Sequence, residues 1–242
     1  MGWIAYAALP SGLVLAVTAH ITTDLASAPL FWVVPLALYL LTFIFAFARR
    51  PLLSVHAMLK VQPFLIIPLV VISAALHSIW VLALHLALFF VTAMVCHGEL
   101  SRRRPPAEKL TEFYLYVSLG GVLGGLFAGL VAPAVFPDIW EYPLLLVLSC
   151  LARPSPVGAS RPLCWAGIAL PDLPAAGLAA LVLAGDLPPW VFVGALALGA
   201  VVLLQFSERP LRFALGVAGC LLIQHFAASS GALETARTLF GA

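Results

Sequence analysis

Hydrophobic residues in this chain gather in stretches of about 20, the length needed to cross a bilayer core, and the charged residues fall almost entirely between them. Inside lipid a backbone needs internal hydrogen bonds, which only helices and closed barrels supply. Strands of a barrel alternate apolar and polar residues, whereas residues 31–48 are apolar on every face. The pattern therefore predicts an all-α fold, a polytopic transmembrane helical bundle. The expected spans cover residues 3–20, 31–48, 61–77, 79–97, 113–135, 139–152, 164–184, 188–206 and 211–228.

We expect about nine helices, with eight or ten as alternatives. The composition agrees with a membrane protein, because 63% of the 242 residues are apolar and 9% are charged. Soluble domains are about 25% charged. No hydrophilic block is large enough to fold as a soluble domain, so we interpret residues 1–242 as a single integral membrane domain. Trp3 and Tyr142 lie near span ends, where aromatic residues commonly anchor helices at the interface.

The basic residues indicate the orientation of the predicted spans. With nine spans, eleven of the twelve Lys and Arg residues fall on one side, and only Arg237 falls on the other. Cytoplasmic loops carry such an excess of positive charge. We therefore predict a bacterial cytoplasmic (inner) membrane protein with the N-terminus and basic loops in the cytoplasm. The basic residues are scattered over several loops, which argues against a nucleic-acid partner.

The glycine-rich segment at residues 120–129 contains overlapping GxxxG patterns. Glycine removes the side chain and lets two membrane helices approach closely. We interpret the segment as a helix-packing surface, and a mobile interface between sliding helices is the functional alternative. The glycines concerned are Gly120, Gly121, Gly124, Gly125 and Gly129.

Polar residues near the ends of the spans are the candidates for function, because ionisable groups are costly in lipid and usually face a cavity or a partner. His20 and Asp24 are four residues apart and form either a proton or cation site or a capped, hydrogen-bonded helix end. His85 lies in the middle of a span. It is interpreted as a satisfied polar residue, with metal or haem ligation together with His20 or His97 as the alternative.

The run from Cys96 to Tyr116 contains a second group of polar residues, His97, Glu99 and Glu112, around a basic loop. These three residues are candidates for a cytoplasmic gate or a docking surface. Their spacing does not match a known zinc motif. The four cysteines form no CxxC pair and are interpreted as small buried hydrophobic residues. No catalytic residue, metal site or cofactor is predicted.

Three separated blocks of the sequence resemble the membrane region of bacterial fused MFS/spermidine synthases. The blocks are LPSGLVLAVTAHITTDLASAPLFWVVPLALYLLTFIFAF, VCHGELSRRRPPAEKLTEFYLYVSLGGVLGGLFAGLVAP and WEYPLLLVLSCLARP. The resemblance is strongest over residues 1–154 and looser over residues 155–242. It implies a transporter-like membrane region. The synthase-like domain of that family has no counterpart here, so we expect a membrane module that is truncated, split from a neighbouring gene or free-standing, and that has no synthase activity.

The leading functional interpretation is a membrane module that transports or senses a small cationic or amphipathic solute. Its polar working residues would be His20, Asp24, His97, Glu99 and Glu112. One alternative is a non-catalytic anchor or scaffold in the lipid bilayer for a spermidine-synthase-like enzyme, a neighbouring subunit or another partner. The other alternative is an intramembrane metal or haem protein.

Overall fold

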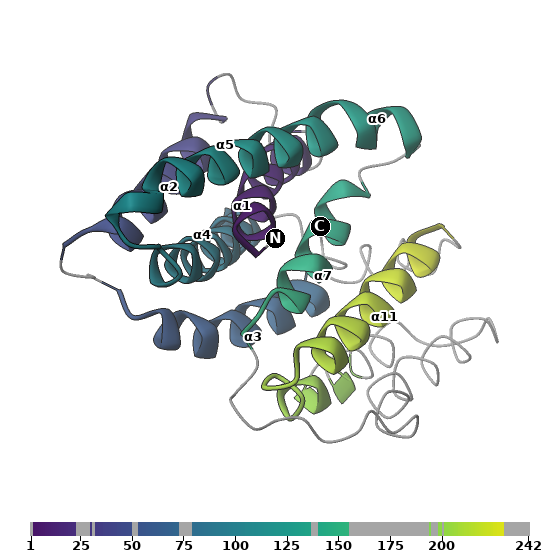
Figure 1. Ribbon diagram of the computed structural model, residues 1–242. Helices are drawn as coiled ribbons and strands as arrows, with labels where there is room; N and C mark the ends of the chain where they lie inside the picture. Colours follow the sequence, from purple (N-terminus) through teal and green to yellow (C-terminus); the bar gives the residue numbers. More distant parts are fainter. Residues whose placement is uncertain are drawn as a thin grey trace. The chain divides into compact units, whose positions relative to one another are not determined.

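A computed structural model describes residues 2–22, 30, 32–49, 53–72, 79–136, 140–154, 194, 198–199 and 201–229. Within these ranges every regular element is a helix and none is a strand (Figure 1). The all-α prediction is thus confirmed for this part of the chain. The elements are α1 (Gly2–His20), α2 (Val33–Phe47), α3 (Val55–Ile72), α4 (Ile79–Arg102), η2 (Ala107–Lys109), α5 (Leu110–Leu126), η3 (Phe127–Val131), α6 (Ala132–Val135), α7 (Glu141–Leu151) and α11 (Pro210–Ser229).

Three of these helical segments are long and apolar enough to cross a membrane: Gly2–His20, Ile79–Arg102 and Ala107–Val135. The last is a continuous run from η2 through α5 and η3 to α6. Apolar helices too short for that criterion are Val33–Phe47, Val55–Val70, Glu141–Leu151 and Pro210–Ile223. The helices support the prediction of a membrane protein. The predicted span 164–184 and most of the span 188–206 lie outside the described residues.

Three helical segments differ in extent from the predicted spans, and one of them is the run predicted at residues 113–135, which begins at Ala107. α3 begins at Val55, whereas the sequence predicted a start at residue 61, so polar residues such as Lys60 lie within the helix. α4 continues to Arg102, beyond the predicted end at residue 97. Hydropathy alone places a span end where polar residues begin, but a helix continues as long as its backbone hydrogen bonds and side-chain contacts allow. His97 and Glu99 are therefore helical residues.

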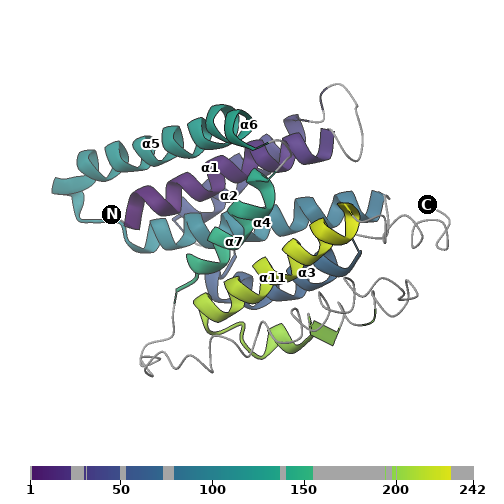
Figure 2. The ribbon, with the colours of Figure 1, turned by 90° about the vertical axis from the view of Figure 1, so that its right-hand side faces the viewer.

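The chain divides into two compact units. The first comprises residues 1–62 and 82–152, and the second comprises residues 63–81 and 153–242. In the first unit α1 packs along α5 and also contacts α7, η3 and α2. Figures 1 and 2 show α1 and α5 running side by side.

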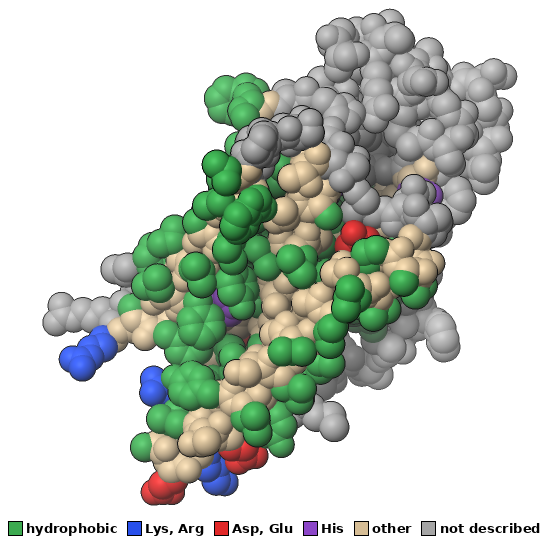
Figure 3. Space-filling model, turned by 90° about the horizontal axis from the view of Figure 1, so that it is seen from above, with side chains coloured by type: hydrophobic (Ala, Val, Ile, Leu, Met, Phe, Trp, Pro, Cys, Tyr) green, Lys and Arg blue, Asp and Glu red, His purple; other side chains and the backbone are tan. Residues whose placement is uncertain are grey.

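The core of the first unit is built on α1. Leu13, Ala16 and Val17 on this helix are almost completely buried, and they belong to one cluster with Phe89 of α4 and Phe113 of α5. Many large apolar side chains remain exposed, especially along α5, and Figure 3 shows them over the face it presents. A contiguous exposed apolar surface is unfavourable in water but is the normal outer surface of a helix in lipid.

In the second unit, α11 is the longest described helix. Phe213 of α11 is fully buried, and the guanidinium carbon of Arg153 lies 5.4 Å from the centroid of its ring. Gly216 lies directly against the side chain of Leu203, so that a methyl group at this position would overlap Leu203. These contacts give α11 a defined packing face within its own unit.

Candidate functional site

The glycine-rich face of α5 lies against α1. Gly120 and Gly124 are buried, and a methyl group added to Gly120 would lie 2.5 Å from the carbonyl oxygen of Ile4. A methyl group on Gly124 would overlap the carbonyl oxygen of Ala8. The two backbones approach this closely because glycine has no Cβ at these positions, which is the way small residues pack membrane helices.

The α1 side of this contact also uses a small residue. A methyl group on Gly12 would lie 3.2 Å from the carbonyl oxygen of Gly124 and 3.0 Å from Cδ1 of Leu145. Next to it, the Ser11 hydroxyl donates a hydrogen bond of 2.8 Å to the carbonyl oxygen of Gly121. This contact therefore combines close backbone packing with a polar cross-link between the helices.

The remaining glycines of the segment are packed less tightly. Methyl groups on Gly125 and Gly129 would lie 4.0 Å and 3.7 Å from the Leu15 side chain, and a methyl group on Gly121 would lie 4.0 Å from the Ser11 hydroxyl. These are ordinary van der Waals distances. Gly129 lies in η3, the π-helical turn that follows α5. The close approach of α5 to α1 thus depends on Gly120 and Gly124, which lie four residues apart, and not on all five glycines.

A largely buried polar cluster, with His20 half-buried, forms where α1, α4 and α7 meet. His20 is the last residue of α1, His85 lies in the middle of α4 and Tyr142 lies in the first turn of α7. His85 and Tyr142 are only 2% and 6% exposed. The Tyr142 hydroxyl and His85 Nδ1 form a hydrogen bond of 2.8 Å. We call these three residues the His–Tyr cluster.

The rings of the His–Tyr cluster also contact one another. His20 stacks on Tyr142 with ring centroids 5.0 Å apart and an interplanar angle of 12°, and its centroid is 4.7 Å from that of His85. Glu141, the neighbour of Tyr142, is also buried, with 5% of its surface exposed. The cluster offers a hydrogen-bonded proton donor and acceptor together with aromatic faces, which attract cations.

The described residues contain no group of three or more His, Cys, Asp or Glu side chains placed to hold a metal ion. In the part of the chain that the structure describes, the rings of His20 and His85 are in contact. Their ring separation of 4.7 Å leaves no room for a haem plane between them.

His97 lies in a separate, largely aromatic site between α2 and α4. Its Nδ1 is 3.0 Å from the hydroxyl oxygen of Thr42, and that hydroxyl also lies 2.7 Å from the carbonyl oxygen of Tyr39. A threonine hydroxyl has one hydrogen to donate, and the Tyr39 carbonyl can only accept. His97 Nδ1 must then donate to Thr42. The rings of Tyr39 and Phe43 meet the imidazole edge-on, with centroids 5.1 Å and 5.0 Å away.

Glu99 belongs to a network that joins the ends of three helices. Its buried carboxylate pairs with Arg102 at 2.8 Å and with Arg103 at 3.4 Å. Arg103 Nη2 donates to the Tyr6 hydroxyl at 3.2 Å, and the Tyr6 hydroxyl donates to the carbonyl oxygen of Ala152 at 3.0 Å. The indole nitrogen of Trp3 donates to the carbonyl oxygen of Arg103. We call this set the arginine network.

The sequence-predicted residues thus lie in different places. His20 lies in the His–Tyr cluster, His97 contacts Thr42, and Glu99 lies in the arginine network. Glu112 is exposed in the first turn of α5, and no described contact joins it to His97 or Glu99. Asp24 lies outside the described residues. The structure therefore brings together His20 and His85, but gives no single site made of His97, Glu99 and Glu112.

Sequence reasoning missed Tyr142 and Thr42 as partners of the histidines. Tyr142 was interpreted as an interfacial anchor, but it is buried and bonds His85. The available signal was that a histidine in the middle of an apolar helix needs a polar partner, because an unsatisfied group is costly there. No protein-family profile, curated protein or solved structure matches this chain.

Proposed function

We propose that this chain is a polytopic membrane module that transports or senses a small cationic or amphipathic solute, with the His–Tyr cluster as its polar site. The observation that carries the proposal is the contact of the buried His85 and Tyr142 with the half-buried His20 among apolar helices, two of which are long enough to span a membrane. Buried ionisable residues in such helices are rare and typically line solute or proton pathways.

The chemistry of the cluster suits a cation. Aromatic faces attract positive charge, and the cluster presents the faces of Tyr142 and of two imidazoles. The Tyr142–His85 hydrogen bond can also relay a proton, since both groups can donate and accept. The resemblance to the membrane region of fused MFS/spermidine synthases favours a polyamine or a related cation. The proposed setting is the bacterial inner membrane.

Uptake into proteoliposomes tests this proposal. The purified protein is reconstituted with an inward or outward proton gradient, and uptake of radiolabelled spermidine and of tetraphenylphosphonium is measured. Tyr142→Phe removes the hydroxyl from His85 and keeps the ring, so we expect the initial rate to fall about tenfold, the equivalent of one hydrogen bond. The matched control is Tyr116→Phe, because Tyr116 is exposed on α5.

The transport proposal fails if neither probe is taken up or bound above the level of empty liposomes. The proposal that the His–Tyr cluster takes part in transport fails if the Tyr142→Phe variant, like the Tyr116→Phe control, transports at the wild-type rate. Because the control also removes a tyrosine hydroxyl, it separates a general effect of that change from an effect at the His–Tyr cluster.

A non-catalytic anchor is the second candidate, and the exposure of α5 favours it. Only 22% of the apolar window within Ala107–Val135 is buried, which leaves a long face for lipid or a partner helix. An anchor for a spermidine-synthase-like enzyme would keep that enzyme at the membrane when Tyr142 is changed to Phe. It would lose the enzyme when Gly124→Ala disturbs the bundle. Co-purification of the two chains distinguishes the candidates.

The full architecture that we propose has nine helices, with the N-terminus and the basic loops in the cytoplasm. It places Ala242 outside the cytoplasm. Alkaline phosphatase fused after Ala242 is expected to be active and a green fluorescent protein fusion at the same site is expected to be dark. The opposite pair of results would show that one predicted helix does not span the membrane, and would allow a cytosolic enzyme to bind at this end.

A further inference from the structure

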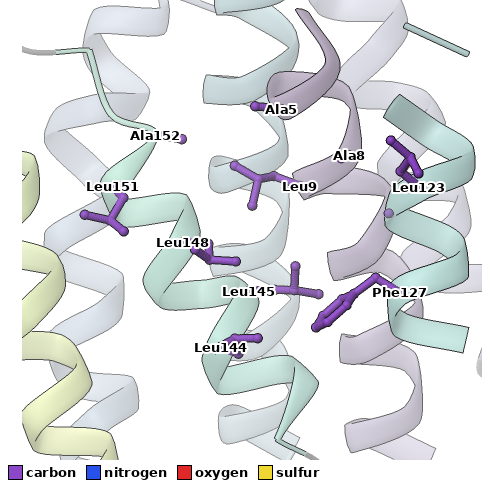
Figure 4. Close-up of a pocket in the computed structure, with 11 residues that line it drawn as sticks. Ala5, Ala8, Leu9, Leu123, Phe127, Leu144, Leu145, Leu148, Leu151 and Ala152 are labelled. Atoms are coloured by element: carbon purple, nitrogen blue, oxygen red, sulfur yellow. The ribbon is translucent and has the colours of Figure 1, made fainter. Parts of the chain in front are cut away.

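An apolar pocket lies between α1, α5 and α7 in the first unit. Its volume is about 500 Å³, within the range of pockets that enclose small organic ligands. Figure 4 shows Leu9, Leu145, Leu148 and Phe127 pointing into it from the three sides. All of its lining residues are Ala, Leu, Gly or Phe, so no side chain in the wall can form a hydrogen bond with an occupant.

One end of the pocket adjoins the arginine network. Ala152 lines the pocket, and its carbonyl oxygen accepts the Tyr6 hydroxyl, which in turn accepts from Arg103. Ala5, another lining residue, is two positions from Trp3. Trp and Tyr beside basic residues are typical of the headgroup level of a membrane. The residues beside this end of the pocket are therefore of the kind that lies at the level of the lipid headgroups.

The charge at this end is positive. Arg102 and Arg103 both pair with the single carboxylate of Glu99, which leaves one positive charge in excess. Their side chains are 65% and 42% exposed, so both guanidiniums have donors available to solvent or to a headgroup. Glu108 and Glu112 are also exposed in the following segment, at the start of the α5 region. Arg103 connects to the pocket through Tyr6, and Arg102 lies beside it through their shared partner Glu99.

We propose that this pocket holds one acyl chain of an anionic phospholipid from the surrounding bilayer, with its phosphate at Arg102 and Arg103. An occupant needs an apolar tail for a wall without polar side chains and a negative group for the basic end. An anionic phospholipid has both in the required order, and the bacterial inner membrane that we propose as the setting contains such lipids. A guanidinium binds a phosphate through two parallel hydrogen bonds.

Native mass spectrometry of the whole protein tests the proposal. The protein is extracted from nanodiscs that contain equal amounts of phosphatidylglycerol and phosphatidylcholine with the same acyl chains. We expect one retained lipid, predominantly phosphatidylglycerol. Ala5→Phe, which places a ring in the pocket, is expected to lower lipid retention about tenfold or more, because it excludes several methylene groups from the apolar site. Ala134→Phe is the matched control, since Ala134 is exposed on α6 and does not line the pocket.

The double variant Arg102→Gln and Arg103→Gln tests the headgroup separately. It is expected to retain a lipid but to lose the preference for phosphatidylglycerol. If Ala5→Phe does not fold, Leu148→Phe fills the pocket from the opposite wall. Equal retention in the pocket-filling variant and in Ala134→Phe would overturn the acyl-chain site. Equal retention of the two lipids by the wild type would overturn the role of the arginines. Neither result depends on solute transport, so the lipid site and the proposed function fail independently.

Discussion

Replacing Gly124 with alanine probes the close backbone approach between α1 and α5. The added methyl group would overlap the carbonyl oxygen of Ala8 and lie 2.9 Å from the Ala8 carbonyl carbon and from the Gly12 nitrogen. All three are backbone atoms, which cannot move aside by a change of rotamer. α1 and α5 would have to separate along their shared face.

The expected loss of stability follows from two opposing effects. Overpacking of this kind costs about 1–3 kcal/mol. Alanine is favoured over glycine in a helix by about 1 kcal/mol at most, which offsets part of that cost. We therefore expect Gly124→Ala to lower the free energy of unfolding by about 1–2 kcal/mol. Larger side chains would cost more, because they extend further into the α1 backbone.

Gly125→Ala is the matched control. It lies on the same helix one residue away, and its methyl group would lie 4.0 Å from the Leu15 side chain, an ordinary contact. The gain in helix propensity is then unopposed, so this variant should be more stable than wild type by about 0.5–1 kcal/mol. The two variants differ from wild type by the same single methyl group, and the expected difference between them is about 2 kcal/mol.

Reversible unfolding in mixed micelles, with the fraction of denaturing detergent increased stepwise and helicity followed by circular dichroism, measures both variants. Gly124→Ala should unfold at a lower detergent fraction than wild type and Gly125→Ala at an equal or higher one. Equal midpoints for the two variants would refute the argument, because the close backbone contact would then not contribute to stability.

Other substitutions test the polar contacts, each by the shift in the thermal midpoint of the purified protein. Thr42→Val keeps the side-chain shape but removes the hydroxyl that bonds His97, and should cost about 1–3 kcal/mol; an unchanged midpoint would contradict a stabilising hydrogen bond between Thr42 and His97 Nδ1. Glu99→Gln should cost about 1–2 kcal/mol and make stability less sensitive to salt, since it removes the carboxylate shared by two arginines; a salt response equal to that of wild type would contradict the pairing. Tyr142→Phe should lower stability by about 1 kcal/mol, and an unchanged midpoint there would argue against its hydrogen bond with His85.

The sequence predicts the bounds of three described helices closely, because hydropathy and the need for backbone hydrogen bonds in lipid are local properties of the chain. The predicted spans 3–20, 31–48 and 211–228 lie within two residues of α1, α2 and α11. The end of α4 was harder to predict, because its last residues are polar and yet helical. Arg102 and Arg103 pair with Glu99 one turn earlier, so this end of α4 is held by side-chain contacts that hydropathy ignores.

The composition of the candidate site could not be predicted from the sequence. His20, His85 and Tyr142 come from three helices that are far apart in the chain, and their contact depends on how α1, α4 and α7 pack. Spacing along one helix predicts only which residues share a face. For the same reason His97 and Glu99, two residues apart in α4, lie in separate networks with different partners.

The two sides of α5 also have a consequence for how this protein can evolve. On the side facing α1, positions 120 and 124 accept no side chain, while the opposite side carries Leu115, Val122 and Leu126, all exposed. In random mutagenesis with selection for a folded protein, the residue types that each position of α5 tolerates should therefore differ between its two sides. Glycine should persist at every fourth residue, and the positions between them should exchange freely among apolar residues. The substitutions that α5 tolerates would then be limited by the backbone of α1 rather than by the chemistry of the side chains of α5 itself.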